Sequence, residues 1–152
     1  MTAEPALPKV YRPLGARMVS AVCGIGLVGM LTFLWLMLPA HVRAEFGWAE
    51  RFTLILVFVG IVSVLYGIFR TRVTASDRGI CVRNGYRRHE LYWAEVVSLS
   101  LTSHRPWALL DLDDGSTIAV MALQSADGPR ATRSARELAA MIVSHSETTH
   151  NN

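Results

Sequence analysis

Two long apolar segments without charge constrain this chain more than any other feature. Met18–Leu38 and Phe52–Phe69 contain no charged residue and no proline. As helices they would be about 30 and about 27 Å long, which matches the hydrocarbon thickness of a bilayer. A core helix of a soluble protein seldom runs this far without a polar face. We therefore predict a membrane-spanning α-helical hairpin over residues 18–69, with a cytoplasmic N-terminal tail before it (1–17), a cytoplasmic domain after it (70–146) and a disordered tail at the end (147–152).

Basic residues flank the outer ends of both segments. The connecting loop Pro39–Arg51 has two arginines, and two glutamates offset them. The outer flanks carry Lys9, Arg12 and Arg17 before the first segment and Arg70, Arg72 and Arg78 after the second. Because Lys and Arg in short flanks remain in the cytoplasm, we predict a multi-pass protein of the cell membrane with both termini cytoplasmic. The bilayer accounts for most of the +3 formal charge, so no nucleic-acid partner is expected.

A cleaved signal peptide is the competing interpretation of the first segment. A basic start, an apolar stretch and Val42-Arg43-Ala44 would supply its three parts. The apolar stretch is longer than the usual signal-peptide core, which favours retention. Cleavage would still leave the C-terminal domain inside, because Arg70 and Arg72 stop transfer after the second segment.

The interior of the hairpin indicates an anchor. Neither segment contains an ionisable Asp, Glu, His or Arg of the kind that pumps and carriers use inside the membrane. Each segment has a pair of small residues one turn apart, Ser20/Gly24 and Ser63/Gly67. Such pairs let helices approach closely. We favour packing of the two helices against each other over a dimerisation face, and the oligomeric state stays open.

After Arg72 the pattern becomes that of short strands. Val97, Leu99 and Leu101 alternate with polar residues. Turn residues occur at Asp77-Arg78-Gly79, Asn84-Gly85 and Asp113-Asp114-Gly115, so the strands should form an antiparallel meander. Residues 125–129 have helix-start chemistry, and Arg130–Ser146 then follows a helical period, with an apolar face made of Ala131, Ala135, Leu138, Met141 and Ile142. Six or seven strands and one C-terminal capping helix predict a small β-barrel.

Short motifs along nearly the whole chain give a family resemblance. They are Val10-Tyr11-Arg12-Pro13, Val73–Ile80, Arg83-Asn84-Gly85, Tyr92–Val96, Pro106-Trp107-Ala108, Leu110–Gly115 and Ala126-Asp127-Gly128. In this order the chain resembles the small actinobacterial membrane proteins with a bacterial PH-like domain, typified by the low molecular weight protein antigen 6 group. The resemblance implies a PH-like fold without an established biochemical role. This sequence gives little support to phosphoinositide binding. In lipid-binding PH domains a long loop carries the basic residues, and here that loop is reduced to Asp77-Arg78-Gly79.

Eight arginines are candidate contacts for lipid headgroups or a partner. Arg70 and Arg72 follow the second segment directly, where headgroups are expected. The others have an ordinary explanation as well, as a charged hairpin edge or a solvated helix surface. They are Arg83, Arg87 and Arg88 around the Asn-Gly turn, and Arg130, Arg133 and Arg136 on the final helix. Trp93 and Trp107 could line a peptide groove, but core packing is the better expectation.

Nothing in the sequence indicates catalysis, a cofactor or a metal site. His89 and His104 are isolated, and no serine elbow, HExxH or phosphate loop occurs. Cys23 and Cys81 belong to different regions and form no CxxC, so no disulfide is expected. The leading hypothesis is thus a non-enzymatic adaptor that presents a PH-like domain to an unidentified membrane or cytoplasmic protein. A sensor of anionic lipid or membrane surface is the alternative, and a small subunit of a transport assembly is a further one.

Overall fold

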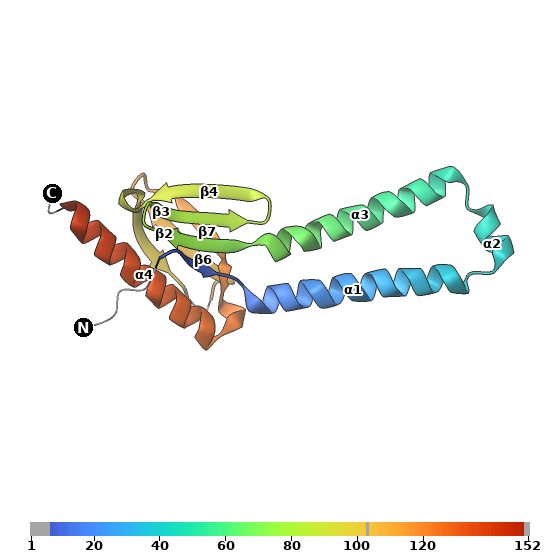
Figure 1. Ribbon diagram of the computed structural model, residues 1–152, viewed down its shortest axis with the longest axis horizontal. Coiled ribbons are helices and arrows are strands. Elements are labelled where there is room, and N and C mark those ends of the chain that lie inside the picture. Colours follow the sequence, from blue (N-terminus) through green and yellow to red (C-terminus); the bar gives the residue numbers. More distant parts are fainter. Residues whose placement is uncertain (1–6, 103, 151–152) are drawn as a thin grey trace. The chain divides into compact units, whose positions relative to one another are not determined.

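The computed structural model describes residues 7–102 and 104–150. The chain forms two compact units. One unit is the helical hairpin, Ala16–Phe69, and the other combines the residues up to Gly15 with those from Arg70 onward. Each unit can be followed by its labels in Figure 1.

The hairpin consists of α1 (Leu14–Met37), the short α2 (Ala40–Glu45) and α3 (Trp48–Arg70). By length and composition, α1 and α3 are both able to cross a membrane. Each begins four residues before its apolar segment, because the helical hydrogen-bond pattern continues through the charged residues at its start. The connection is accordingly shorter than the predicted loop, and it is partly helical itself.

Among the residues that the structure describes, seven strands in two antiparallel sheets build the other unit. The first sheet has the order β1 (Lys9–Tyr11), β2 (Arg72–Ser76), β3 (Gly79–Asn84), β4 (Arg87–Tyr92). The second has the order β5 (Val96–Ser100), β6 (Trp107–Leu112), β7 (Thr117–Gln124). Short 3-10 helices, Trp93–Glu95 and Ser125–Asp127, precede β5 and the final helix α4 (Pro129–His150).

Both sheets and α4 enclose one hydrophobic core (Figure 1). Alternate residues of β2 and β3 point into it, including Val73 and Val82, and so do the predicted apolar residues of α4 from Ala135 to Ile142. Asn84 connects the two sheets, because its side chain accepts from Met121 N at 3.1 Å and donates to Ala119 O. The predicted Asn-Gly turn is shifted by one residue: Asn84 pairs with Arg87, and Gly85-Tyr86 form the turn.

Both predicted tails differ from expectation. Residues 9–11 form β1, with Tyr11 opposite Val73, and the first turn of α1 takes up residues 14–17. Three residues are too few for a strand period to be visible in a sequence. At the other end α4 continues to His150, since no glycine or proline follows Ser146 to stop it. Residues 1–6 and 151–152 lie outside the described part of the chain.

Candidate functional site

Three arginines from three neighbouring strands stand side by side on the outer face of the first sheet. Arg72 of β2 is directly opposite Arg83 of β3, and Arg83 is directly opposite Arg88 of β4. Residues opposite each other in an antiparallel pair place their Cβ atoms about 5 Å apart on the same face. The adjacent inward positions are taken by Val73 and Val82, which are fully buried. We call Arg72, Arg83 and Arg88 the arginine row.

The chain around Thr71 holds the β3–β4 turn in place. Gly85 N donates a hydrogen bond to Thr71 Oγ1 at 3.1 Å, and Gly85 has a positive φ of 62°. Thr71 is the residue between Arg70, which ends α3, and Arg72, which begins β2. This bond therefore ties the turn that carries Arg83 and Arg88 to the point where the chain leaves α3. Arg87, opposite Asn84, belongs to the other face of the sheet by strand alternation.

The row carries more positive charge than its neighbours offset. Arg88 forms an ion pair with Glu90 two residues along β4. The pKa of Arg88 is raised above its usual value, first by a hydrogen bond with the Cys81 side chain and then by attraction to Cys81 and Glu90. Like charges directly opposite in a sheet are unfavourable. Three aligned arginines with one ion-paired carboxylate beside them thus make a surface suited to an anion.

A groove of about 510 Å³ continues from the row along the same face. Arg88, Glu90 and Cys81 line one part of it, and Arg78 and Tyr92 line another. The Tyr92 side chain is 70% exposed, which is high for an aromatic residue. β4 is also the last strand of its sheet within the described residues, so its outer backbone edge has no strand partner there.

The arginines of α4 form a separate surface. Arg130, Arg133 and Arg136 are all exposed, and α4 packs on β5, β7 and the two 3-10 helices. Next to them, Glu137 accepts from Lys9 Nζ at 2.7 Å and from the Tyr11 hydroxyl at 3.5 Å. Burial raises the pKa of Tyr11, and the nearby charge and hydrogen bond of Glu137 raise it further. Lys9 of β1 thus forms an ion pair with Glu137 on this side of α4.

The remaining polar candidates are structural. Trp93 is buried, donates from Nε1 to Ser76 O at 3.0 Å and stacks on His145 with ring centroids 4.3 Å apart, so it packs in the core as expected. His145 Nδ1 lies 2.8 Å from Met141 O. Within the described residues, no group of three or more His, Cys, Asp or Glu could hold a metal ion.

Arg72, Arg83 and Arg88 were each predicted from the sequence as candidate contacts, but their alignment in one row was not predicted. The signal that could have found it is the spacing of the two turns: a two-residue turn after Ser76 and another after Asn84 place Arg72, Arg83 and Arg88 in register. The role of Asp127 was also missed. Its carboxylate accepts from Leu14 N at 3.1 Å and from Gly15 N at 3.0 Å, so it caps the start of α1.

Comparison with known proteins agrees with this architecture. Residues 70–140 match the model of the bacterial PH domain family. Uncharacterized proteins of Mycobacterium bovis and Mycobacterium tuberculosis are 37% identical over 62 residues, which is 41% of this chain and 40% of theirs. The aligned part thus spans less than half the length of these relatives. No solved structure matches the chain.

The predicted fold class is confirmed by the strands, the final helix and the family match together. The finer resemblance to the antigen 6 group remains a prediction. PH-like domains are in general binding modules, and the match is to no enzymatic family. Two apolar helices long enough to cross a membrane, and two antiparallel sheets with a closing helix in the region that matches the bacterial PH domain family, support a membrane-associated protein with a PH-like domain.

Proposed function

We propose that the chain is a two-span protein of the cell membrane whose termini and PH-like domain lie in the cytoplasm. The domain is a non-enzymatic binding module, and the arginine row binds anionic headgroups of the inner leaflet. The observation that carries this proposal is the strand register that aligns Arg72, Arg83 and Arg88, with Arg72 only two residues after the end of α3 in the chain. This geometry favours the lipid alternative over the adaptor hypothesis that the sequence alone places first.

The energetics of such a contact are modest but sufficient for a tethered domain. A Lys or Arg near an anionic leaflet contributes about 1 kcal/mol, so the row would contribute about 3 kcal/mol. Since the helices keep the domain at the surface, no translational freedom is lost on each contact. The interaction should weaken as salt screens the charges.

The test uses the full chain in nanodiscs of phosphatidylcholine, with or without about a third of phosphatidylglycerol. We expect amide exchange in the β3–β4 turn to be slower in the anionic discs, and this protection to disappear at high salt. The triple variant Arg72→Gln, Arg83→Gln, Arg88→Gln should lose it. The matched control, Arg130→Gln, Arg133→Gln, Arg136→Gln, should keep it. Equal exchange in both kinds of disc would refute headgroup binding.

The orientation is tested by labelling intact cells with a membrane-impermeant maleimide, after Cys23→Ala and Cys81→Ala. Ala44→Cys places an exposed thiol between the two long helices, and Ala126→Cys places one in the domain. We expect labelling at residue 44 only, with labelling at 126 after lysis. Labelling at 126 in intact cells would reverse the proposed topology.

A protein partner is a second function with its own supporting observation. The outer edge of β4 has no strand partner among the described residues, and Tyr92 at the end of this strand is 70% exposed. An open strand edge with exposed apolar side chains can accept an extended peptide as an additional strand. A photo-crosslinking residue at Tyr92 should give one discrete adduct in cells, whereas the same residue at the exposed Asp114 should give none. Identical adducts at both positions would count against this function.

A further inference from the structure

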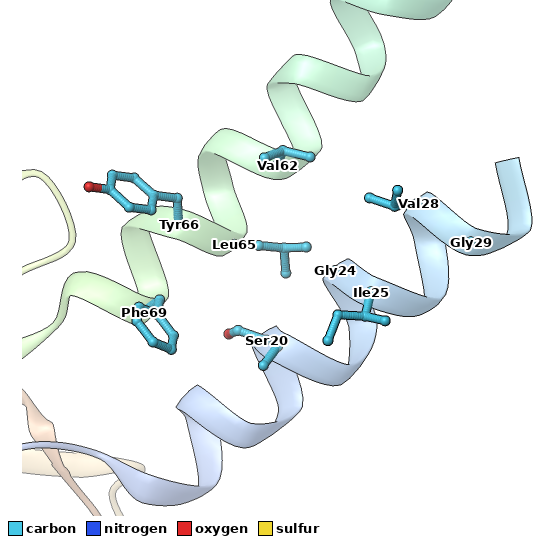
Figure 2. Close-up of a pocket in the computed structure, with 10 residues that line it drawn as sticks. Ser20, Gly24, Ile25, Val28, Gly29, Val62, Leu65, Tyr66 and Phe69 are labelled. Atoms are coloured by element: carbon cyan, nitrogen blue, oxygen red, sulfur yellow. The ribbon is translucent and has the colours of Figure 1, made fainter. Parts of the chain in front are cut away.

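The two long helices enclose a groove of about 580 Å³ that the protein itself leaves unfilled (Figure 2). Ser20, Gly24 and Val28 of α1 line one side at intervals of four residues, and Leu65 and Phe69 of α3 line the other. A Cβ on Gly24 would meet Leu65 Cδ1 at 3.6 Å, so the helices touch there. At Gly29, farther along the groove, a Cβ would meet nothing within 4 Å. The helices therefore separate after their contact at Gly24.

A cation marks one end of this groove. Arg17 precedes Ser20 and Ala21 by three and four residues, so it lies on the same face of α1. Its guanidinium carbon is 4.1 Å from the ring centroid of Phe69, the last lining residue of α3. Its Nε is buried and has no hydrogen-bond partner among the described residues. A buried guanidinium nitrogen without an acceptor is unfavourable, and a phosphate oxygen would satisfy it.

The dimensions of the groove favour a slender occupant. Ser20 to Gly29 corresponds to a rise of about 13.5 Å, and a helix about 10 Å across would fill 580 Å³ with only about five residues. The groove is therefore too small for a second helix, which could place only some of its side chains in it. A chain of methylene groups can follow the whole length, and the polar end of such a molecule would reach Arg17 about one turn beyond Ser20.

We propose that this groove binds one acyl chain of an anionic glycerophospholipid, with the phosphate held by Arg17. The proposal rests on the proposed insertion of the hairpin into a bilayer, and it is independent of the arginine row. In this proposal Arg17 binds a lipid phosphate, in addition to being one of the basic residues that set the orientation of the hairpin. The bound lipid would contact both α1 and α3 and complete their packing.

The proposal is tested by native mass spectrometry of the full chain, delipidated in mild detergent and titrated with dioleoyl phosphatidylglycerol or dioleoyl phosphatidylcholine. We expect one saturable lipid per chain, with phosphatidylglycerol bound about fivefold more tightly, because the choline of phosphatidylcholine offsets the charge of its phosphate and one cation near a net negative headgroup contributes about 1 kcal/mol. Arg17→Gln should remove this preference. Gly29→Leu and, at the other end, Ala21→Leu should reduce the binding of both lipids by filling the groove.

Two control variants match these changes. Arg12→Gln removes an exposed arginine of the same flank, and Gly60→Leu adds a side chain on α3 where nothing lies within 4 Å and outside the groove lining. Both should bind lipid as the unmodified chain does, with the same helix content by circular dichroism.

Three results would overturn the proposal. The first is that the unmodified chain retains no saturable lipid. The second is that lipid binding is lost in the arginine-row variant and kept in Arg17→Gln, because this would locate the lipid on the PH-like domain. The third is a lipid-free dimer that Gly29→Leu dissociates, because a second copy would then occupy the groove.

Discussion

At the scale of single residues, Gly79 occupies a position that leaves no room for a side chain. It opens β3 with φ 151°, and a Cβ there would lie 2.0 Å from the carbonyl oxygen of Leu91 in β4. We predict that Gly79→Ala lowers the free energy of unfolding by at least about 3 kcal/mol, because both the backbone angle and the clash oppose it. Denaturant unfolding of the full chain in detergent measures this loss.

Gly115→Ala is the control for Gly79→Ala. Gly115 also has a positive φ, 81°, but a Cβ there would meet nothing within 4 Å. This variant should therefore cost only the backbone term, about 1–2 kcal/mol. Equal losses for the two variants would contradict the close approach of β4 to Gly79.

Tyr11 predicts how stability depends on alkaline pH. Its pKa in the folded chain is raised, by burial first and by Glu137 second, above the ordinary value of 10.0. The neutral phenol is thus favoured in the folded state, and its stabilising contribution is complete below pH 10 and lost as the pH rises through the raised value. We predict that Tyr11→Phe makes the unfolding free energy fall less steeply above pH 10. Parallel pH profiles for the two proteins would argue against this linkage.

These residue contacts were beyond sequence reasoning for a simple reason. The turn glycines are visible in a sequence because turn chemistry is local, and the Gly79 and Gly115 turns were predicted. Lys9 and Tyr11, in contrast, contact a residue 128 and 126 positions away. A contact at that separation follows from the fold and has no local pattern.

At the scale of elements, the side chain of Asp127 caps the start of α1 at Leu14 and Gly15, which belong to the same compact unit as Asp127. The sequence around Asp127 indicated the start of the helix that follows it, but its two carboxylate oxygens accept from Leu14 N and Gly15 N instead. The first amides of a helix have no partner within the helix, so a carboxylate there supplies one and also favours the helix dipole.

We predict that Asp127→Ala weakens the first turn of α1. Loss of a cap costs about 1 kcal/mol, which corresponds to about fivefold faster amide exchange at Leu14 and Gly15. Hydrogen exchange of a peptide covering residues 12–18 measures it. Asp127→Asn should keep most of the protection, and Asp113→Ala, a change in an exposed turn, should keep all of it. Unchanged exchange in Asp127→Ala would show that the cap has no energetic role.

At the scale of the whole molecule, the hairpin is an insertion between two paired strands. β1 ends at Tyr11 and β2 begins at Arg72, and Tyr11 lies opposite Val73. A domain beginning at residue 70, as the sequence indicated, would therefore lack one edge strand together with the Lys9–Glu137 ion pair.

A shortened chain tests this arrangement. We predict that replacing residues 14–70 with a short glycine-serine linker gives a domain that folds without detergent, because paired antiparallel strands need only a short turn between them. The chain 71–150 alone should be less stable by about 2–3 kcal/mol, since the burial of Tyr11 is lost. Thermal unfolding followed by circular dichroism compares the two. Equal stability would show that β1 is dispensable.

The sequence by itself determined the features that arise from local patterns. Two uncharged segments of about 20 residues, alternating strand residues, turn glycines and one amphipathic helix were enough to predict a hairpin and a small β-barrel closed by a helix, and the family resemblance implied that this barrel is PH-like. Only the tertiary structure decided which distant residues meet: β1 beside β2, Asp127 at the start of α1, Arg72, Arg83 and Arg88 in one row, and Arg17 over Phe69 at the end of a groove. These contacts are determined by the register of the strands and by how the helices cross, and both depend on the packing of the whole core.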